Sequence, residues 1–347
     1  MSEDSDPRDT PLHPRRRAML LGHEQAEQKL LQAFHAGRLH HAWLIAGPRG
    51  VGKATLAYRF ARFLLKHPDS PGEARSLDVD PSDPVFHRVA AGSHPDLFVI
   101  ERAYDLKSGK VKSETGVDVA RGATGFFART AGEGGWRVAI VDPADDLNEE
   151  AANALLKIIE EPPDRSIFLI LAHAPGRVLP TIRSRSVRLN LAPLDEPLVV
   201  EVLRSVLAPE APPAGDLALA ANLSRGSPGR ALGLLQSNGA KVFATFRHLV
   251  DGLPKLDRRQ VSNFADQLQS RTAAEEFTMF CELLEDWMAE EARKLGSQGR
   301  PAADRWATAH SELRHSIRVA NALNLDRRQL VMHAFDAIQD AARNSRE

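Results

Sequence analysis

The chain has 347 residues, which is enough for two or three domains, and its content of 43% hydrophobic and 26% charged residues is that of an ordinary soluble protein. Its 45 Lys and Arg residues nearly balance 46 Asp and Glu residues, so the net charge provides no general attraction to nucleic acid or membranes. The single cysteine, Cys281, excludes an internal disulfide and a cysteine-cluster metal site.

The N-terminal region predicts an arm followed by a helix. Residues 1–17 are polar, contain proline and lack periodicity, which predicts a disordered arm that ends in three arginines. From Gly22 the apolar residues recur at helical spacing up to Gly37. No apolar run approaches the roughly 18 residues of a membrane span, and the N-terminus lacks the apolar segment of a signal peptide. We therefore expect a cytoplasmic protein.

The pattern around residues 43–65 predicts a strand, a glycine loop and a helix. Residues 43–46 form an apolar run of strand length, residues 47–53 read GPRGVGK, and residues 54–65 are apolar at helical spacing. Glycines allow several backbone N–H groups to approach a phosphate, and a lysine at the helix N-terminus adds a positive charge. The sequence therefore predicts a P-loop whose nucleotide-binding residues are Gly47, Gly50, Gly52, Lys53, Ala54 and Thr55.

This P-loop lacks one group that ATP hydrolysis requires. The pattern G-x-x-x-x-G-K-[ST] has a hydroxyl directly after the lysine to hold Mg²⁺. Here that position is Ala54, and Thr55 comes one residue late. The loop therefore indicates nucleotide binding more strongly than catalysis.

The sequence between the P-loop helix and residue 130 predicts loops and turns around one strand and one helix. Residues 67–84 are rich in Pro, Ser, Asp and Gly and predict an exposed connection. His94 to Asp96 predict a turn into a strand at 97–100, with a metal role for His94 and Asp96 as the alternative. Residues 104–116 predict a loop or a loose hairpin, and a helix follows over residues 117–130.

A second strand with a functional signal covers residues 136–142 and ends in Asp142. In a P-loop fold this carboxylate faces the Mg²⁺ site, as the Walker B aspartate does. ATPases of this class usually carry glutamate at the next position to orient the attacking water, and here that residue is Pro143. Asp145 and Asp146 lie two to three residues out of register.

The remaining pattern predicts a parallel sheet and then only helices. A helix begins at Asn148 and ends at Pro162, and apolar strands follow at 167–172 and 187–191. Strands that alternate with helices over residues 22–191 predict a parallel sheet covered on both faces, with its ligand site at the carboxyl ends of the strands. Three short helices are expected at 196–207, 216–223 and 228–235, and residues from 241 onward are helical throughout.

Four segments together resemble the bacterial DNA polymerase III clamp-loader subunits of the AAA+ class. They are residues 40–57 (HHAWLIAGPRGVGKATLA), 94–97 (HPDL), 136–163 (WRVAIVDPADDLNEEAANALLKIIEEPP) and 181–186 (TIRSRS). The resemblance covers about residues 20–235. It implies an α/β P-loop (AAA+) domain with a parallel sheet, then a three-helix lid domain and an all-α C-terminal collar domain. Their expected boundaries are 18–192, 193–238 and 239–347, after a disordered arm at 1–17.

The resemblance also assigns roles to individual residues. The family's serine-arginine-cysteine motif corresponds to residues 184–186, which makes Arg185 an arginine finger acting in trans, with Ser186 in place of the cysteine. The lid's sensor arginine corresponds to Arg230. Many members carry a four-cysteine zinc module, which this chain lacks, so neither zinc nor another metal is expected.

The resemblance thus implies a noncatalytic stator subunit of the clamp loader, without ATPase or polymerase chemistry of its own. No cofactor is required, although the loop could hold ATP or ADP weakly or statically. The implied partners are the ATPase motor subunits and the delta subunit and, indirectly, the sliding clamp and primed DNA, with no membrane.

Two other functions remain open from the residues. In the first, the chain is an active ATPase motor subunit in which Thr55 and Asp145 replace the missing groups. In the second, it binds DNA nonspecifically through Arg15 to Arg17 and the lysines of residues 107–112. Hydrolysis by the isolated chain would favour the first function, and a steep salt dependence of DNA affinity would favour the second.

Overall fold

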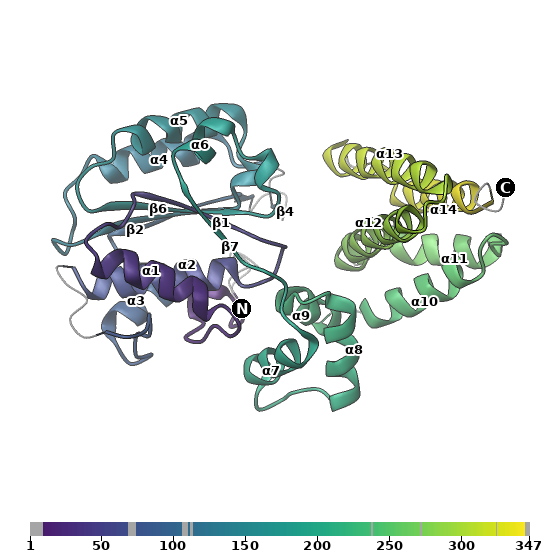
Figure 1. The fold of residues 1–347 in the computed structure, drawn as a ribbon, viewed down its shortest axis with the longest axis horizontal. Coiled ribbons are helices and arrows are strands. Elements are labelled where there is room, and N and C mark those ends of the chain that lie inside the picture. Colours follow the sequence, from purple (N-terminus) through teal and green to yellow (C-terminus); the bar gives the residue numbers. More distant parts are fainter. Residues whose placement is uncertain are drawn as a thin grey trace. The chain divides into compact units, whose positions relative to one another are not determined.

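The chain forms two compact units, Met1–Ala231 and Leu232–Glu347, in a computed structural model (Figure 1). The structure describes residues 10–68, 74–105, 110–111, 114–236, 239–270, 273–323 and 325–343. The three-part division expected from the sequence, with boundaries at 192 and 238, stays a proposal.

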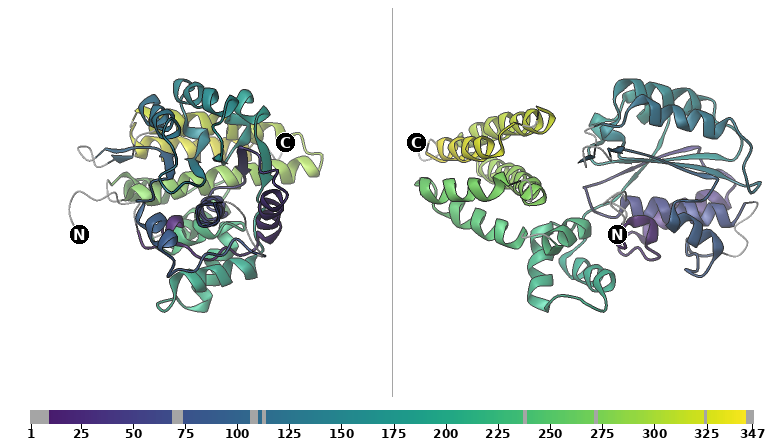
Figure 2. Two further views of the ribbon diagram at one scale, coloured as in Figure 1. Left: turned by 90° about the vertical axis from the view of Figure 1, so that its left-hand side faces the viewer. Right: turned by 180° about the vertical axis from the view of Figure 1, so that it is seen from behind.

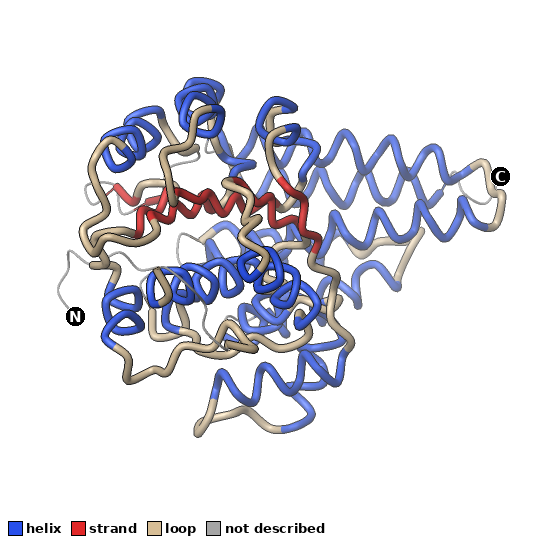
Figure 3. Tube along the Cα trace, turned by 60° about the vertical axis from the view of Figure 1, so that its left-hand side comes forward, coloured by secondary structure: helices blue, strands red, loops and turns tan. Residues whose placement is uncertain are grey.

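A five-stranded parallel sheet forms the centre of the first unit. Its strands, in spatial order, are β2 (Leu97–Glu101), β5 (Arg137–Asp142), β6 (Ser166–Ala172), β1 (Ala42–Ala46) and β7 (Val187–Asn190). Every neighbouring pair is parallel. These are the five strands that the sequence predicts, and Figure 3 shows them in red between two layers of helices. The α/β P-loop fold class is confirmed.

Helices cover both faces of the sheet (Figures 1 and 2). One face carries α1 (Glu24–His35), α2 (Lys53–Lys66) and α3 (Pro84–Ala91), and the other carries α4 (Val117–Phe127), α5 (Glu149–Glu160) and α6 (Pro180–Ser184). The strands in the middle of the sheet are apolar and buried along their length, because both faces lie under helices.

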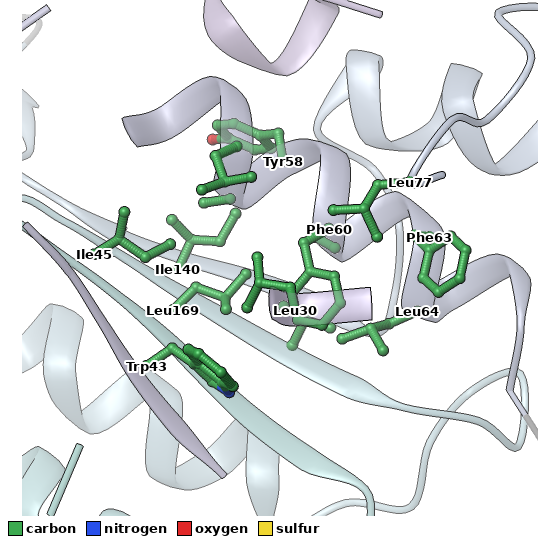
Figure 4. Close-up of a cluster of buried hydrophobic side chains, with 14 of the residues drawn as sticks. Leu30, Trp43, Ile45, Tyr58, Phe60, Phe63, Leu64, Leu77, Ile140 and Leu169 are labelled. Atoms are coloured by element: carbon green, nitrogen blue, oxygen red, sulfur yellow. The ribbon is translucent and has the colours of Figure 1, made fainter. Parts of the chain in front are cut away.

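Two apolar clusters hold these layers together. On the α2 face, Phe60 and Leu64 pack with Ile45, Ile140 and Leu169 of the sheet, as Figure 4 shows. On the other face, residues of α5 pack against Phe168, Ile170 and Ala172. Because β1, β5 and β6 alternate their side chains between the two clusters, each of these three strands anchors helices on both faces.

Helix α3 is missing from the sequence prediction. Asp83 caps it by accepting a hydrogen bond from the Val85 backbone N–H at 2.8 Å, and Pro84 occupies its first turn. The preceding segment is also less exposed than expected, since Leu77 and Val79 are buried. Residues 69–73 of the predicted connection lie outside the described residues.

The prediction of a disordered arm is wrong for residues 13–17. Pro14–Arg16 form a 3₁₀ helix, η1. The buried Arg62 guanidinium donates to the backbone oxygens of Arg15 (2.9 Å) and Arg17 (2.5 Å) and stacks over the Phe86 ring. Burial lowers the pKa of Arg62 to about 10. A buried arginine needs acceptors, and here the N-terminal backbone supplies them.

The hairpin prediction at residues 104–116 is confirmed where the structure describes it. Strands β3 (Tyr104–Asp105) and β4 (Lys110–Val111) pair antiparallel. Residues 106–109 and 112–113 lie outside the described residues. The His94 to Asp96 segment forms the predicted turn, in which the Leu97 N–H donates to the His94 backbone oxygen and the Asp96 N–H donates to His94 Nδ1, both at 3.2 Å. The Asp96 carboxylate accepts the N–H groups of Gly132 and Glu133 at 2.6 and 2.9 Å.

Within the residues that the structure describes, the elements that follow the sheet are all helices. The three short helices that the sequence predicts are α7 (Glu196–Leu207), α8 (Ala214–Ser224) and α9 (Pro228–Gln236). The second unit contains α10 (Gly239–Asp251), α11 (Arg258–Gln269), α12 (Ala274–Ser297), α13 (Ala302–Leu323) and α14 (Arg327–Arg343). Its core is aromatic: the rings of Phe280 and Phe335 are stacked, with 6.0 Å between their centroids. Among the described residues, no helix is long and apolar enough to cross a bilayer.

Candidate functional site

The P-loop joins β1 to α2 at the carboxyl edge of the sheet, as predicted. Gly50 and Gly52 have φ angles of +75° and +117°, which side-chain-bearing residues rarely adopt. A Cβ at Gly47 would stand 2.5 Å from the Leu191 backbone oxygen. Glycine is therefore required at all three positions by conformation or by close approach.

Lys53 lies at the start of α2 and is only 4% exposed. Its Nζ donates to the backbone oxygens of Gly47 and Pro48, both at 2.7 Å. Burial lowers the pKa of Lys53 to about 8, although the carboxylates of Asp142 and Asp145 act in the opposite direction. The lysine is thus held in the loop at an electrostatic cost to the folded state.

This cost predicts a stabilising substitution, Lys53→Met. A pKa lowered from 10.5 to about 8 corresponds to about 3 kcal/mol, and two lost hydrogen bonds cost about 1 kcal/mol each. We therefore expect the variant to gain about 1 kcal/mol of unfolding free energy at pH 7. Between pH 8 and pH 10 the wild-type protein should gain stability as the lysine deprotonates, because its pKa is lower in the folded than in the unfolded state. The difference should therefore change sign, and the lost hydrogen bonds should leave the variant about 1 to 2 kcal/mol less stable at pH 10. Denaturant unfolding at pH 7 and pH 10 measures it, and a pH-independent difference would contradict this electrostatic origin.

The Mg²⁺ side of the loop does not fit ATP hydrolysis. Ala54 and Thr55 occupy the first turn of α2 and are partly buried. Alanine offers no oxygen to a metal ion at the position where the P-loop pattern needs one. The loop amides and Lys53 fit a phosphate, whereas the donors that would hold Mg²⁺ against it are incomplete. In the described part of the chain, no group of three or more His, Cys, Asp or Glu side chains could hold a metal ion.

Asp142 ends β5 at the same edge of the sheet, opposite Glu101 of β2 in the strand register. Burial and the Glu101 charge raise the pKa of Asp142 to about 6, and the Lys53 charge lowers it. Lysine and aspartate therefore influence each other, which agrees with the expected convergence of the P-loop and the Walker B strand.

The Asp145 carboxylate is occupied by hydrogen bonds from backbone N–H groups. Its two oxygens accept the N–H groups of His173 (2.6 Å) and Ala174 (2.8 Å), and the residue is buried. Asp146 instead pairs with Arg102 at 3.3 Å. Asp145 therefore ties the segment after β5 to the end of β6, so orienting a water molecule would require breaking these hydrogen bonds. This arrangement disfavours the alternative in which Asp145 restores an ATPase site.

Three residues at this edge were not singled out from the sequence. Burial, followed by the Lys53 charge, lowers the pKa of His173 at the end of β6 to about 4, so its imidazole is neutral at pH 7. His23 Nε2 lies 2.8 Å from the Val51 backbone oxygen. The Leu20 side chain lies 3.0 Å from where a Cβ at Gly52 would stand. A polar residue at a strand end was the only signal for His173, whereas the other two come near the loop through tertiary packing.

The start of α9 lies directly against the P-loop. Ser227 Oγ donates to the Arg49 backbone oxygen at 2.5 Å, and the Gly229 N–H donates to the Gly50 oxygen at 2.8 Å. The next residue is Arg230, the predicted sensor, and its backbone nitrogen would lie 2.9 Å from a Cβ at Gly50. The structure thus brings residues 227–230, which lie in the segment expected to be the lid, against the P-loop.

Arg185 lies at the opposite edge of the sheet. It follows α6 and precedes β7, which runs parallel to β1 with Val187 beside Trp43 and Asn190 beside Ala46. The P-loop follows Ala46, so a strand of four residues, about 13 Å at ~3.3 Å per residue, separates the two edges. The Arg185 guanidinium is exposed. Its Nη2 pairs with Glu160 Oε1 at 2.9 Å, and Nη1 donates to the Thr181 oxygen at 3.2 Å.

The basic groups of the DNA-binding alternative are only partly described. The backbone oxygens of Arg15 and Arg17 accept hydrogen bonds from Arg62, which places this segment on α2. Lys107 and Lys112 lie outside the described residues, and the side chain of Lys110 does as well.

The chain is similar in sequence to known subunits of DNA polymerase III. The family described as "DNA polymerase III, delta subunit" matches residues 22–195. DNA polymerase III subunit delta' of Pseudomonas aeruginosa is 35% identical over 266 residues, which cover 75% of this chain and 74% of that protein. The delta' subunit of Escherichia coli K12 is 38% identical over 223 residues, 63% of this chain and 61% of that protein.

Among solved structures, a gamma subunit-related protein of DNA polymerase III from Thermotoga maritima matches 91% of this chain and 99% of that chain. Its TM-score is 0.47 at 16% identity. The family match over residues 22–195 includes the P-loop, the Walker B strand and Arg185. The chain therefore belongs to the delta-prime family of DNA polymerase III clamp-loader subunits.

Proposed function

We propose that the chain is a noncatalytic stator subunit of the clamp loader and that Arg185 completes the ATP site of a neighbouring motor subunit. The placement of Arg185 carries this proposal: its guanidinium is exposed and lies at the sheet edge away from the chain's own P-loop. A side chain at that edge cannot reach a phosphate in its own loop, but it is accessible to a docked partner.

The chemistry of the two sites supports the same division of roles. Ala54 and Pro143 replace the metal-binding hydroxyl and the water-orienting acid, so the P-loop lacks two groups that phosphoryl transfer needs. An arginine supplied in trans stabilises the charge that develops on the transferred phosphoryl group. Its planar guanidinium can donate two parallel hydrogen bonds to phosphate oxygens.

The partners and the cofactor follow from this role. We propose that the chain binds the ATPase motor subunits and the delta subunit, and acts indirectly on the sliding clamp and primed DNA in the cytoplasm. It requires no cofactor and no zinc. ATP or ADP held weakly by Lys53 and the loop amides, with Arg230 in the lid as sensor, would be static.

A direct test is ATP hydrolysis by the isolated chain. We expect no turnover above the uncatalysed background, with or without primed DNA, because the metal and water groups are absent. The control is the complex reconstituted with motor subunits, which should hydrolyse ATP under the same conditions. Turnover by the isolated chain that Lys53→Ala abolishes would favour the motor-subunit alternative instead.

A further inference from the structure

Glu160 and Arg185 form an ion pair on the surface of the first unit. Glu160 Oε1 lies 2.9 Å from Arg185 Nη2, and the two side chains are 45% and 40% exposed. On its other side, the guanidinium donates through Nη1 to the Thr181 backbone oxygen at 3.2 Å and to Ser184 Oγ at 3.4 Å. The arginine is therefore held from two directions, by its own helical turn and by α5.

The core fixes the two elements that present this pair. Ile182 of α6 is 1% exposed and belongs to the same buried cluster as Ile158 and Ile159 of α5. The turn that carries Arg185 is closed by a hydrogen bond from the Arg185 N–H to the Ile182 oxygen at 3.2 Å. Because both helix ends are anchored, the carboxylate and the guanidinium meet without a rearrangement of the backbone.

Glu160 occupies a position that is unfavourable for its own helix. It is the last residue of α5, where the partial negative charge of the helix C-terminus repels a carboxylate. The Arg185 guanidinium supplies the positive charge that compensates for this repulsion. The position of Glu160 is thus explained by the arginine, since helix stability would favour a neutral or basic residue there.

We propose that Glu160 is a positioning residue that restricts the Arg185 guanidinium to the conformations in which it reaches the neighbouring subunit's ATP. This inference rests on the proposed arginine-finger function and deepens it. An exposed arginine has many rotamers, and each one outside the reactive geometry reduces the fraction of productive encounters. Exposed ion pairs are weak, so the restriction should change the rate by about threefold.

The test uses a reconstituted clamp loader in which the neighbouring motor subunit is the only one able to hydrolyse ATP. We expect Glu160→Ala to lower kcat about threefold and to leave KM unchanged, because Glu160 acts on the arginine and not on ATP binding. Glu161→Ala, which removes the adjacent exposed carboxylate, should leave kcat unchanged. Native mass measurement confirms that each complex assembles, so a lower rate is not a loss of subunits.

A double-mutant cycle separates this inference from the function on which it rests. Arg185→Ala should abolish most of the turnover, and adding Glu160→Ala to it should change nothing further. If Arg185→Ala lowers kcat while Glu160→Ala alone does not, Glu160 has no positioning role but the finger stands. An equal effect of Glu160→Ala in both backgrounds would also overturn the inference. If Arg185→Ala has no effect, the finger function itself is wrong.

Discussion

Replacing Arg185 with alanine is expected to slow ATP hydrolysis at the neighbouring motor subunit by about 10³-fold. Such a loss corresponds to about 4 kcal/mol of transition-state stabilisation. It is large because the charge on the transferred phosphoryl group develops in a site from which water is excluded, where one fixed guanidinium has a strong effect. The substitution should leave folding intact, since the side chain is exposed and its ion pair contributes little to stability.

A neighbouring arginine provides the matched control. Arg183 lies on α6, two residues before Arg185, which caps that helix, and is also exposed. Arg183→Ala removes the same charge only two residues away, so a general electrostatic effect on docking would lower turnover in both variants. We expect the Arg183 variant to hydrolyse ATP within about twofold of the wild-type complex. Equal losses in the two variants would contradict a specific role for Arg185.

The largest effect on stability is expected for Gly50→Ala, which should lower the unfolding free energy by about 3 kcal/mol. An alanine at φ +75° costs about 1 kcal/mol through its backbone conformation. The added Cβ would also stand 2.9 Å from the Arg230 backbone nitrogen and 3.1 Å from Gly229 Cα, so the start of α9 must move. That movement should weaken the hydrogen bonds from Gly229 and Ser227 to the loop, adding about 2 kcal/mol.

A Gly134→Ala control separates the cost of the backbone conformation from the cost of the contact with α9. The Gly134 φ of +76° nearly equals that of Gly50, but an added Cβ there meets nothing within 4 Å. Gly134→Ala should therefore cost only about 1 kcal/mol, and the excess in Gly50→Ala measures the contact with α9. Hydrogen exchange at the Gly229 amide should accelerate in the Gly50 variant alone. Equal destabilisation of the two variants would show that the lid contact contributes nothing.

The sheet and the P-loop could be predicted because their signals are local. Apolar runs of strand length, the glycine spacing before Lys53 and the carboxylate at the end of β5 are all readable within a few residues. The carboxyl ends of parallel strands share one edge, so the convergence of Lys53 and Asp142 followed from the order of the elements.

Other features depend on partners that are distant in sequence. Arg62 is 47 residues from Arg15, so its hydrogen bonds to the N-terminal backbone have no local signal, and the arm was predicted to be disordered. Asp145 was considered as a catalytic acid because sequence position alone does not reveal that His173 and Ala174 donate to it. Helix α3 was missed because it has only eight residues and follows a segment rich in proline and glycine.

The pairing of Glu160 with Arg185 also could not be predicted, because the two residues are distant in the sequence. Each residue is polar and exposed, which is the usual state of a surface side chain and predicts nothing by itself. Only the packing of α6 against α5 brings the two together.

The central claim is that this chain acts on a neighbour's ATP and not on its own. The most direct measurement compares Arg185→Ala with Lys53→Ala in the same reconstituted complex, by the rate of DNA-stimulated ATP hydrolysis at the neighbouring site. We expect the Arg185 variant to lose about 10³-fold and the Lys53 variant to stay within about twofold of wild type. Loss of turnover with Lys53→Ala and normal turnover with Arg185→Ala would contradict the claim.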